Sequence, residues 1–483
     1  MLFNSLPFFL FLPIVFIIYW FILKRNLKVQ NFFIATASYL FYGWWDWRFL
    51  FLIFASTVVD YLCGLAIANK KNKKDKRLFL IISMVFNLGL LGFFKYCNFF
   101  IDSFEDLIAV FGVNWNTDTL NVLLPVGISF YTFQTMSYTI DVYRGKLDPT
   151  KDFVAFAAFV SFFPQLVAGP IERASNLLPQ FYKKREVDYA RLADGGRQIL
   201  WGFFKKVVVA DNCAILVNKT FGVSDFSTLS GVTLWVSIIF FAFQIYCDFS
   251  GYSDIAIGLA KWFGFDLKTN FRTPYFTRSI PEFWRRWHIS LTTWFRDYVY
   301  IPLGGSRVSR NKSLRNIAIV FLVSGFWHGA KWTFIVWGIL HFVYFLPSFL
   351  FKKHRNNTED QLYPNRIPSI REIGGIIFTF LLVCIAWVFF RADDLGSAFD
   401  YVFYMFKNIG YHPGILLLHL KEISILFILI LLVVEYILRN KNHPFEIKDW
   451  PKGLRWASYL LLFYLVLFQM QYHGASEFIY FQF

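Results

Sequence analysis

The chain has 483 residues, of which 57% are hydrophobic, 22% aromatic and 17% charged, and its mean hydropathy is +0.46. These values exclude an ordinary water-soluble globular protein and predict an integral membrane protein that crosses the bilayer several times. The net charge of +16 could indicate nucleic-acid binding. However, the basic residues cluster in short loops between apolar segments, which is the distribution that orients membrane proteins. We therefore expect no nucleic-acid partner.

The first third of the chain predicts the orientation. The apolar run at residues 7–23 has no basic residues before it and no small-residue cleavage site after it, so we interpret it as a retained helix. Residues 70–77 carry six basic side chains, whereas residues 102–118 carry four acidic ones and no lysine or arginine. Because basic loops stay in the cytoplasm, this asymmetry predicts an external N-terminus.

The middle of the chain alternates apolar spans with irregular segments. Residues 123–140, 198–216 and 229–260 have the length and composition of membrane helices. Residues 153–170 are apolar but contain two prolines and lie between basic loops, which favours a re-entrant or interfacial element over a full crossing. Residues 268–315 are rich in basic and aromatic side chains, which predicts a helix at the cytoplasmic side or a half-inserted hairpin.

Further spans are expected at residues 316–351, 374–390, 423–438 and 457–470, and residues 398–412 are expected along the external face. The fold class is therefore an all-α polytopic membrane protein with about ten to twelve transmembrane or re-entrant helices. We expect one membrane domain over residues 1–483. Its parts are peripheral helices at 1–120, a core at 121–345 that contains the segment 268–315, and C-terminal helices at 346–483.

The sequence gives little sign of a metal site. The five cysteines stand singly in apolar stretches, without pairs at metal-ligand spacing, which is typical of buried thiols. Two carboxylates, Asp248 and Asp254, flank a Ser-Gly-Tyr-Ser sequence, and we expect them to stabilise a break in the surrounding helix rather than to do chemistry.

His328 lies among glycines and aromatic residues inside a segment expected to be in the membrane. It follows Arg315 by 13 residues, about 20 Å of helix, which places it around or beyond the middle of a hydrocarbon core roughly 30 Å thick. Residues 316–351 are too long for one ordinary crossing, so we expect a break near Gly325 and Gly329. Ionisable groups at that depth are expensive and are commonly functional, and we expect a polar cavity with His328 on its wall.

Each candidate residue also has a structural interpretation. His328 could be hydrogen-bonded to a carbonyl or a tyrosine, and the residues alone favour neither possibility. His341 is more typical of packing. Arg285 and Arg286, before His288, could bind an anionic donor, or could extend to anionic lipid headgroups.

Five sequence motifs resemble those of the membrane-bound O-acyltransferase (MBOAT) family, and most closely its bacterial branch of alginate and peptidoglycan O-acetyltransferases and teichoic acid D-alanyl transferases. They are PVGISF at 125–130, PQLVAGPIER at 164–173, DFSGYSD at 248–254, FWRRWHIS at 283–290 and SGFWHG at 324–329. The closing residues 478–483 also resemble the ending of alginate-type members. The resemblance implies helices arranged around a central tunnel, with His328 as the active-site histidine and His288 as the second characteristic polar position.

With that resemblance, His328 is expected to act as general base or to carry the acyl group, and His288 to orient the donor or the developing oxyanion. Arg285, Arg286, Arg296 and Trp327 are candidates for donor binding. No cofactor is expected to be tightly bound, and acetyl-CoA is the expected acyl donor. The expected location is the bacterial cytoplasmic (inner) membrane.

The resemblance favours O-acetylation of an exported or cell-surface polysaccharide, either peptidoglycan or an alginate-like chain. The resemblance also implies an extracytoplasmic SGNH-type partner that finishes the transfer, and consistent with a separate partner, no Gly-x-Ser-x-Gly nucleophile elbow occurs in this chain. The alternative within the family is D-alanyl transfer from a carrier protein to teichoic acid. A remoter alternative is a proton-coupled transporter or flippase, which predicts repeat symmetry that the sequence does not show.

Overall fold

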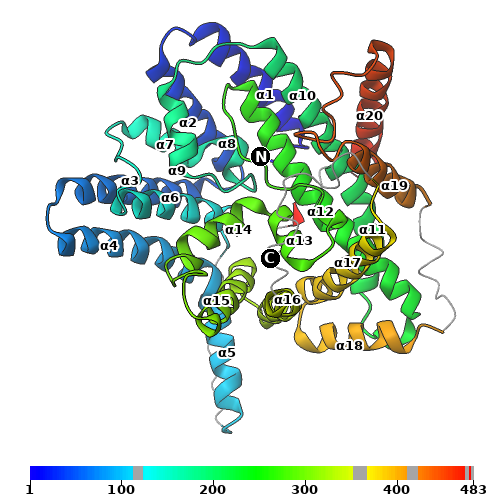
Figure 1. Cartoon of the computed structure of the whole chain (residues 1–483). Coiled ribbons are helices and arrows are strands. Elements are labelled where there is room, and N and C mark those ends of the chain that lie inside the picture. The colour runs from blue at the N-terminus through cyan, green and yellow to red at the C-terminus, as the bar shows by residue number, and fades with distance from the viewer. Residues whose placement is uncertain (113–122, 352–366, 411–421, 474–477, 480–483) are drawn as a thin grey trace. The chain divides into compact units, whose positions relative to one another are not determined.

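The computed structural model describes residues 1–112, 123–351, 367–410, 422–473 and 478–479 (Figure 1). Within these ranges the regular structure consists of helices and contains no strand, so the predicted all-α class is confirmed. Three parts of the segments discussed above lie outside the described residues: Asp118, His412 and residues 480–483. The helices form two compact units, residues 1–192 with 259–268, and residues 193–258 with 269–483. The predicted three-part division of the domain stays a prediction.

The first unit contains the N-terminal helices. Their bounds are α1 Leu6–Ile17, η1 Ile18–Ile22, α2 Leu27–Gly43, η2 Trp47–Phe49, α3 Leu50–Asn69, α4 Lys73–Leu91, η3 Gly92–Tyr96, α5 Cys97–Ala109, α6 Ile128–Tyr143, α7 Phe153–Ser161, α8 Phe163–Leu166, α9 Ala174–Leu177 and η4 Leu178–Tyr182. Side-chain caps start several of them. Asn26 accepts from the backbone N–H groups of Lys28 and Val29, and Asn72 accepts from that of Lys74.

Residues 153–170, expected to be a re-entrant or interfacial element, contain two short helices. The first, α7, has nine residues and spans about 14 Å, too short to cross a bilayer. Its start is capped by Asp152, which accepts from the backbone N–H of Ala155. The backbone then changes direction at Phe162, whose φ and ψ leave the helical region before Pro164 opens α8.

The second unit contains most of the helices from α10 onward. Their bounds are α10 Tyr189–Phe203, η5 Phe204–Ala210, α11 Asp211–Phe221, η6 Phe226–Thr228, α12 Gly231–Trp262, η7 Pro274–Phe276, α13 Ile280–Arg286, α14 Ile289–Phe295, η8 Arg296–Tyr300, α15 Arg310–His328, α16 Trp332–Leu350, α17 Ile370–Arg391, α18 Leu395–Lys407, α19 Glu422–Ile437 and α20 Lys452–His473. Residues 268–315 contain several short helices, and their predicted position at the cytoplasmic side stays a prediction.

The break expected between Asp248 and Asp254 is wrong, because α12 continues through both residues. The carboxylates instead hold two consecutive lysines of the π-helical segment η5. Lys205 lies 2.5 Å from Asp254, and Lys206 lies 2.6 Å from Asp248, all with side chains at most 14% exposed. Each charge is neutralised by a partner on a neighbouring helix, so the helix itself needs no interruption to accommodate them.

The break predicted near Gly325 and Gly329 is confirmed at Gly329, where α15 ends and the chain turns into α16. The two helices pack closely through glycines. A Cβ at Gly325 would lie 2.3 Å from the carbonyl oxygen of Phe334, and one at Gly338 would lie 2.5 Å from that of Phe321. Only glycine permits this approach, which fixes the hairpin that carries His328 at its turn.

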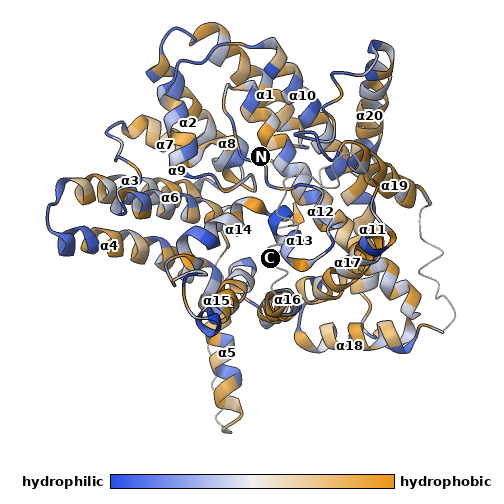
Figure 2. Ribbon diagram, viewed as in Figure 1, coloured by the Kyte–Doolittle hydropathy of each residue, from blue (hydrophilic) through white to orange (hydrophobic). Residues whose placement is uncertain are grey.

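Six helical stretches of the described part of the chain are long and apolar enough to cross a membrane: Trp47–Asn69, Lys73–Ala109, Gly231–Trp262, Trp332–Leu350, Ile370–Arg391 and Lys452–Gln471. Two shorter apolar helices are Leu6–Ile22 and Ile423–Ile437. Figure 2 shows orange, hydrophobic residues along helices such as α17, and blue at the basic start of α4. The chain is therefore a multi-pass membrane protein.

Candidate active site

His328 is the last residue of α15 and is only 3% exposed. Its ring lies among aromatic side chains, with centroid distances of 4.9 Å to Trp327, 5.0 Å to Trp337 and 5.3 Å to Phe390. Three helices, α15, α16 and α17, therefore enclose the imidazole. Neither of the two cavities described below is lined by His328, so the polar cavity predicted around it stays a prediction.

His288 is fully buried at the start of α14, and its ring centroid is 6.5 Å from that of His328. Its backbone φ of 43° lies in the left-handed region, which is strained for a residue with a side chain. Phe249 packs edge-on against the imidazole at 4.7 Å between centroids. Burial lowers the pKa of His288 to about 3, so the ring is neutral at physiological pH.

Asn270 determines which nitrogen of His288 carries the proton. The amide oxygen of Asn270 accepts from the backbone N–H of Ser290 at 3.2 Å and from its hydroxyl at 2.9 Å, which identifies that atom as the oxygen. The same oxygen lies 3.2 Å from Nδ1 of His288. Since an amide oxygen can only accept, Nδ1 must donate, and the neutral ring presents Nε2 as a hydrogen-bond acceptor.

A third histidine belongs to the same aromatic cluster. The indole N–H of Trp284 lies 3.3 Å from Nδ1 of His341, and His341 packs 4.8 Å from Trp337, which also contacts His328. His341 is fully buried, as expected of a packing residue. Trp284 and His341 therefore pack behind Trp337, one of the aromatic side chains that surround His328.

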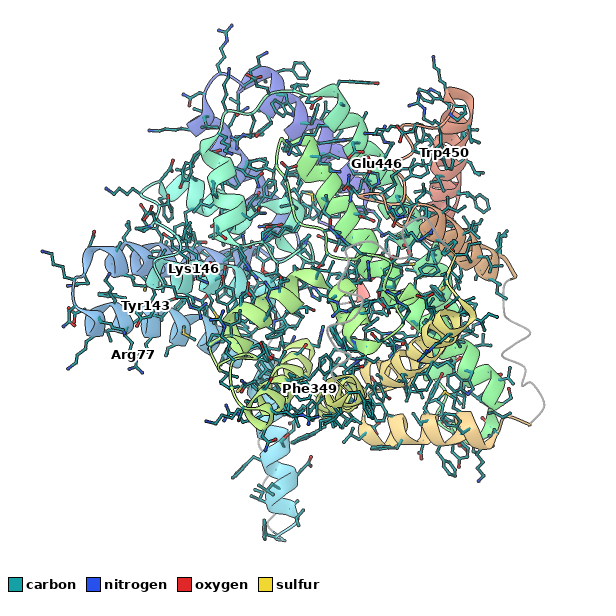
Figure 3. All side chains as sticks on the ribbon, viewed as in Figure 1. Arg77, Tyr143, Lys146, Phe349, Glu446 and Trp450 are labelled. Atoms are coloured by element: carbon teal, nitrogen blue, oxygen red, sulfur yellow. The ribbon has the colours of Figure 1, made fainter. Side chains whose placement is uncertain are left out.

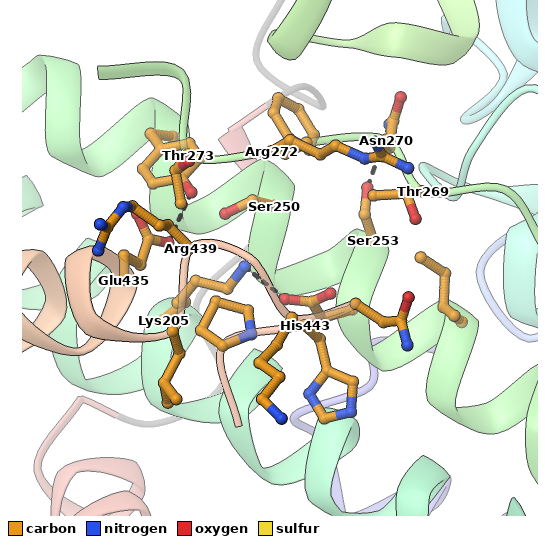
Figure 4. Close-up of a pocket in the computed structure, with 18 of the residues that line it drawn as sticks. Lys205, Ser250, Ser253, Thr269, Asn270, Arg272, Thr273, Glu435, Arg439 and His443 are labelled. Atoms are coloured by element: carbon orange, nitrogen blue, oxygen red, sulfur yellow. Dashed lines mark hydrogen bonds and ion pairs between the residues drawn. The ribbon is translucent and has the colours of Figure 1, made fainter. Parts of the chain in front are cut away.

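A polar cavity of about 190 Å³ lies beside this cluster within the second unit (Figure 4). Its wall carries four lysine or arginine side chains and two carboxylates: Lys205, Arg272, Arg439, Lys441, Asp254 and Glu435. Tyr246 donates to Glu435 at 2.6 Å. Asn270 also lines the cavity, and in Figure 4 it lies beside Ser253, to which it donates at 3.2 Å. One residue thus connects the cavity wall to His288.

The predicted donor-binding residues lie in different places. Trp327 is with the histidines, 5.9 Å from His288 between ring centroids. Arg286 is buried, and its carbonyl accepts from the backbone N–H of Arg272 at 3.0 Å. Arg285 and Arg296 line a separate, largely apolar groove, where Arg296 pairs with Asp297 at 2.7 Å.

Comparison with known proteins decides the family. The family model described as MBOAT, membrane-bound O-acyltransferase family, matches residues 150–389. A probable alginate O-acetylase AlgI of Azotobacter vinelandii is 42% identical over 84% of this chain and 78% of its own. The peptidoglycan O-acetyltransferase of Helicobacter pylori is 35% identical over 100% of this chain and 98% of its own. The chain belongs to the membrane-bound O-acyltransferase family.

A more distant relative is the teichoic acid D-alanyltransferase of Streptococcus thermophilus, which is 30% identical over 58% of this chain and 70% of its own. The matched MBOAT region contains both histidines, and the chain is accordingly an O-acyltransferase. Asn270 of this MBOAT protein lies outside the five sequence motifs, so its contact with His288 could not be predicted from them. Arg272 and Arg439 were not predicted either, since they come together only through folding.

Proposed function

We propose that this protein transfers an acetyl group across the membrane for O-acetylation of an exported polysaccharide, either peptidoglycan or an alginate-like chain. The observation that carries the proposal is the buried pair His288 and His328, 6.5 Å apart, in a chain 42% and 35% identical to proteins named for these two acetylations. That separation between the ring centroids is too long for a direct hydrogen bond between the two imidazoles.

His328 serves as the general base. It takes the proton of the acceptor hydroxyl while that oxygen forms a bond to the thioester carbonyl carbon, after which the carbon–sulfur bond breaks and the thiol leaves with a proton. A covalent acetyl-histidine is the alternative role. The Nδ1–H tautomer of His288 supports a further detail: its Nε2 can accept from a hydroxyl group, whereas stabilising an oxyanion would need an N–H there.

The acetyl donor is acetyl-CoA, and it enters through the polar cavity rather than along Arg285, Arg286 and Arg296. The cavity supports this placement because its four basic side chains exceed its two carboxylates, which suits the phosphates of a nucleotide-bearing thioester. Asn270 provides the connection from this cavity to His288. The cavity side of the membrane is then cytoplasmic.

The last step of the proposed reaction takes place outside the membrane, on a partner protein. An extracytoplasmic SGNH-type esterase-like protein receives the acetyl group and completes its transfer to the polysaccharide. The protein lies in the bacterial inner membrane with its N-terminus outside, as the charges of residues 70–77 and 102–118 predict. The resemblance of the motifs to the acetylating branch of the family supports this relay.

Inside-out vesicles supplied with radiolabelled acetyl-CoA test the proposal. Label should accumulate in the vesicle lumen as hydroxylamine-sensitive esters, and His328→Ala should reduce its rate by on the order of 10²-fold or more. Lys312→Ala, at an exposed position of the same helix, should transfer label at the wild-type rate. Normal transfer by His328→Ala would contradict the catalytic role. Label arriving only from a D-alanyl-charged carrier protein would favour the teichoic acid reaction.

A further inference from the structure

A second cavity, of about 890 Å³, runs along α15 within the second unit and is lined mainly by apolar side chains. Much of its apolar lining comes from α14, α15 and α16: Leu291, Phe295, Ile317, Val320, Phe345 and Phe349. Figure 3 labels Phe349, which comes from α16. Along α15 the lining extends from Arg310 to Ser324, which is about 21 Å of helix. The groove is thus longer than one bilayer leaflet, roughly 15 Å of hydrocarbon.

The charged side chains that line the groove are all arginines, and one of them, Arg296, is paired with the neighbouring Asp297 at 2.7 Å. The lining includes Arg285, Arg296 and Arg310 and contains no aspartate or glutamate. The guanidinium of Arg310, at the start of α15, donates to the carbonyl oxygen of Leu350, at the end of α16, at 3.0 Å. This hydrogen bond fixes the side chain of Arg310 between the two helix ends. The hydroxyl groups of Tyr300 and Ser313 lie 3.2 Å apart, which brings the end of η8, the element of Arg296, to the same end of the groove.

We propose that this groove binds an anionic phospholipid, with its phosphate at Arg296 and Arg310 and one acyl chain along α15 toward Ser324. The length and apolar lining fit a hydrocarbon chain, and the arginines select a negative headgroup. A coenzyme is a poorer match because its thiol-bearing arm is polar and would need hydrogen-bond partners where the groove offers Ile317, Val320 and Phe321. The neighbouring Leu322 does not line the groove and is 39% exposed, so it provides a control position on another face of α15.

The groove is also in contact with the aromatic side chains that surround His328. Trp284 forms part of the groove wall, and its indole contacts both His341 and Trp337, the latter at 5.6 Å between ring centroids. Ser324 at the far end is one helical turn before His328. A bound acyl chain therefore stabilises the side chains that enclose His328, which makes the lipid a structural ligand of the active site.

Native mass spectrometry of the delipidated protein tests the proposal, using phosphatidylglycerol and phosphatidylcholine with the same acyl chains. Phosphatidylglycerol should bind more tightly than phosphatidylcholine. Arg310→Ala should weaken its binding roughly fivefold, corresponding to about 1 kcal/mol per basic residue, whereas Arg307→Ala, at an exposed position outside the groove, should not. Val320→Trp should fill the groove and reduce binding of both lipids more than tenfold, whereas Leu322→Trp should leave it unchanged.

Unfolding temperatures of the lipid-free variants, measured alongside, separate lost binding from lost folding. Equal affinity for the two lipids would overturn the anionic selectivity, and wild-type binding by Val320→Trp would overturn the groove as the site. Displacement of phosphatidylglycerol by acetyl-CoA would instead identify the groove as the donor site. These measurements do not depend on acetyl transfer, so their failure is distinguishable from failure of the proposed function.

Discussion

The amide oxygen of Asn270 lies 3.2 Å from Nδ1 of His288 while it also accepts from the backbone N–H of Ser290. This arrangement explains why His288 adopts a strained backbone with φ 43° at the start of α14. The left-handed conformation places the ring of His288 and the N–H of Ser290 around the side-chain amide oxygen of Asn270, while the N–H of Ile289 donates to the backbone carbonyl of Asn270 at 2.9 Å. The resulting hydrogen bonds stabilise the strain and fix the tautomer, so Asn270 acts as a positioning residue for His288.

Replacement of Asn270 should therefore reduce activity through His288. In Asn270→Ala, Nδ1 loses its acceptor and the ring can adopt the other tautomer, which should lower kcat by tenfold or more; a wrong tautomer costs far more in serine proteases, on the order of 10⁴. Asn270→Asp retains an oxygen acceptor and should recover part of the activity. Because a carboxylate favours the protonated imidazole, the aspartate variant should also shift the acidic limb of the pH profile upward. An alanine variant with the wild-type rate and pH profile would exclude the positioning role.

The neutral state of buried His288 should make the protein less stable in acid. Its pKa is about 3 in the folded protein and about 6.5 in the unfolded chain, so between these values the unfolded state binds the extra proton. Stability from this residue is complete above about pH 6.5 and is lost as the pH falls. Between pH 7.5 and pH 5, wild-type protein should lose about 2 kcal/mol more than His288→Gln, from about 1.4 kcal/mol per pH unit.

Thermal unfolding in detergent, followed by tryptophan fluorescence at several pH values, measures this difference. The two proteins should show parallel behaviour above pH 7 and diverge below pH 6.5. Identical pH dependence for wild type and His288→Gln would mean that His288 is solvated or paired with an acid in the folded state.

The α15–α16 hairpin should be sensitive to one methyl group. In Gly338→Ala, the new Cβ would lie 2.5 Å from the carbonyl oxygen of Phe321, so the helices must separate, at a cost of about 1–3 kcal/mol. Gly374→Ala is the control, because a Cβ there meets nothing within 4 Å, and alanine in a helix should stabilise by about 0.5–1 kcal/mol. Unfolding midpoints should move in opposite directions, and equal midpoints would show that the hairpin tolerates separation.

Apolar spacing and loop charges were sufficient to predict the helical class and the helix break near Gly329. They could not predict that α12 continues past Asp248 and Asp254, because the lysines that neutralise these carboxylates lie more than forty residues earlier in the chain. The contact between Asn270 and His288 could not be predicted either, because it depends on how the chain folds between them. Hydropathy reports depth in the membrane, whereas these contacts depend on which helices become neighbours.

The arginines illustrate a second limit. Arg285 and Arg286 are adjacent in sequence and were predicted to act together on the donor. In the helix α13 they are separated by about 100° around the axis, and only Arg285 lines the apolar groove, while Arg286 is buried. Sequence adjacency therefore did not predict that the two side chains have different surroundings, and donor binding by either arginine stays a prediction.

The ion pair of Lys205 and Asp254 should matter far more for stability than a surface pair of similar length. Its atoms are 2.5 Å apart and its side chains are 3% and 14% exposed. Lys205→Met would leave the carboxylate buried without its cation, which typically costs 3–5 kcal/mol, about what other buried pairs show. Arg191 and Asp266 form a pair at 2.7 Å with 29% and 73% exposure, so Arg191→Met should cost less than about 1 kcal/mol.

The double variant Lys205→Met with Asp254→Asn distinguishes charge from packing. Because it removes both charges, it should recover much of the stability lost in Lys205→Met alone, as a double-mutant cycle of unfolding midpoints would measure. Since both residues line the polar cavity, the double variant should still weaken acetyl-CoA binding through the lost lysine. Equal destabilisation in the single and double variants would show that the lysine stem contributes by packing and that the buried charge is compensated elsewhere.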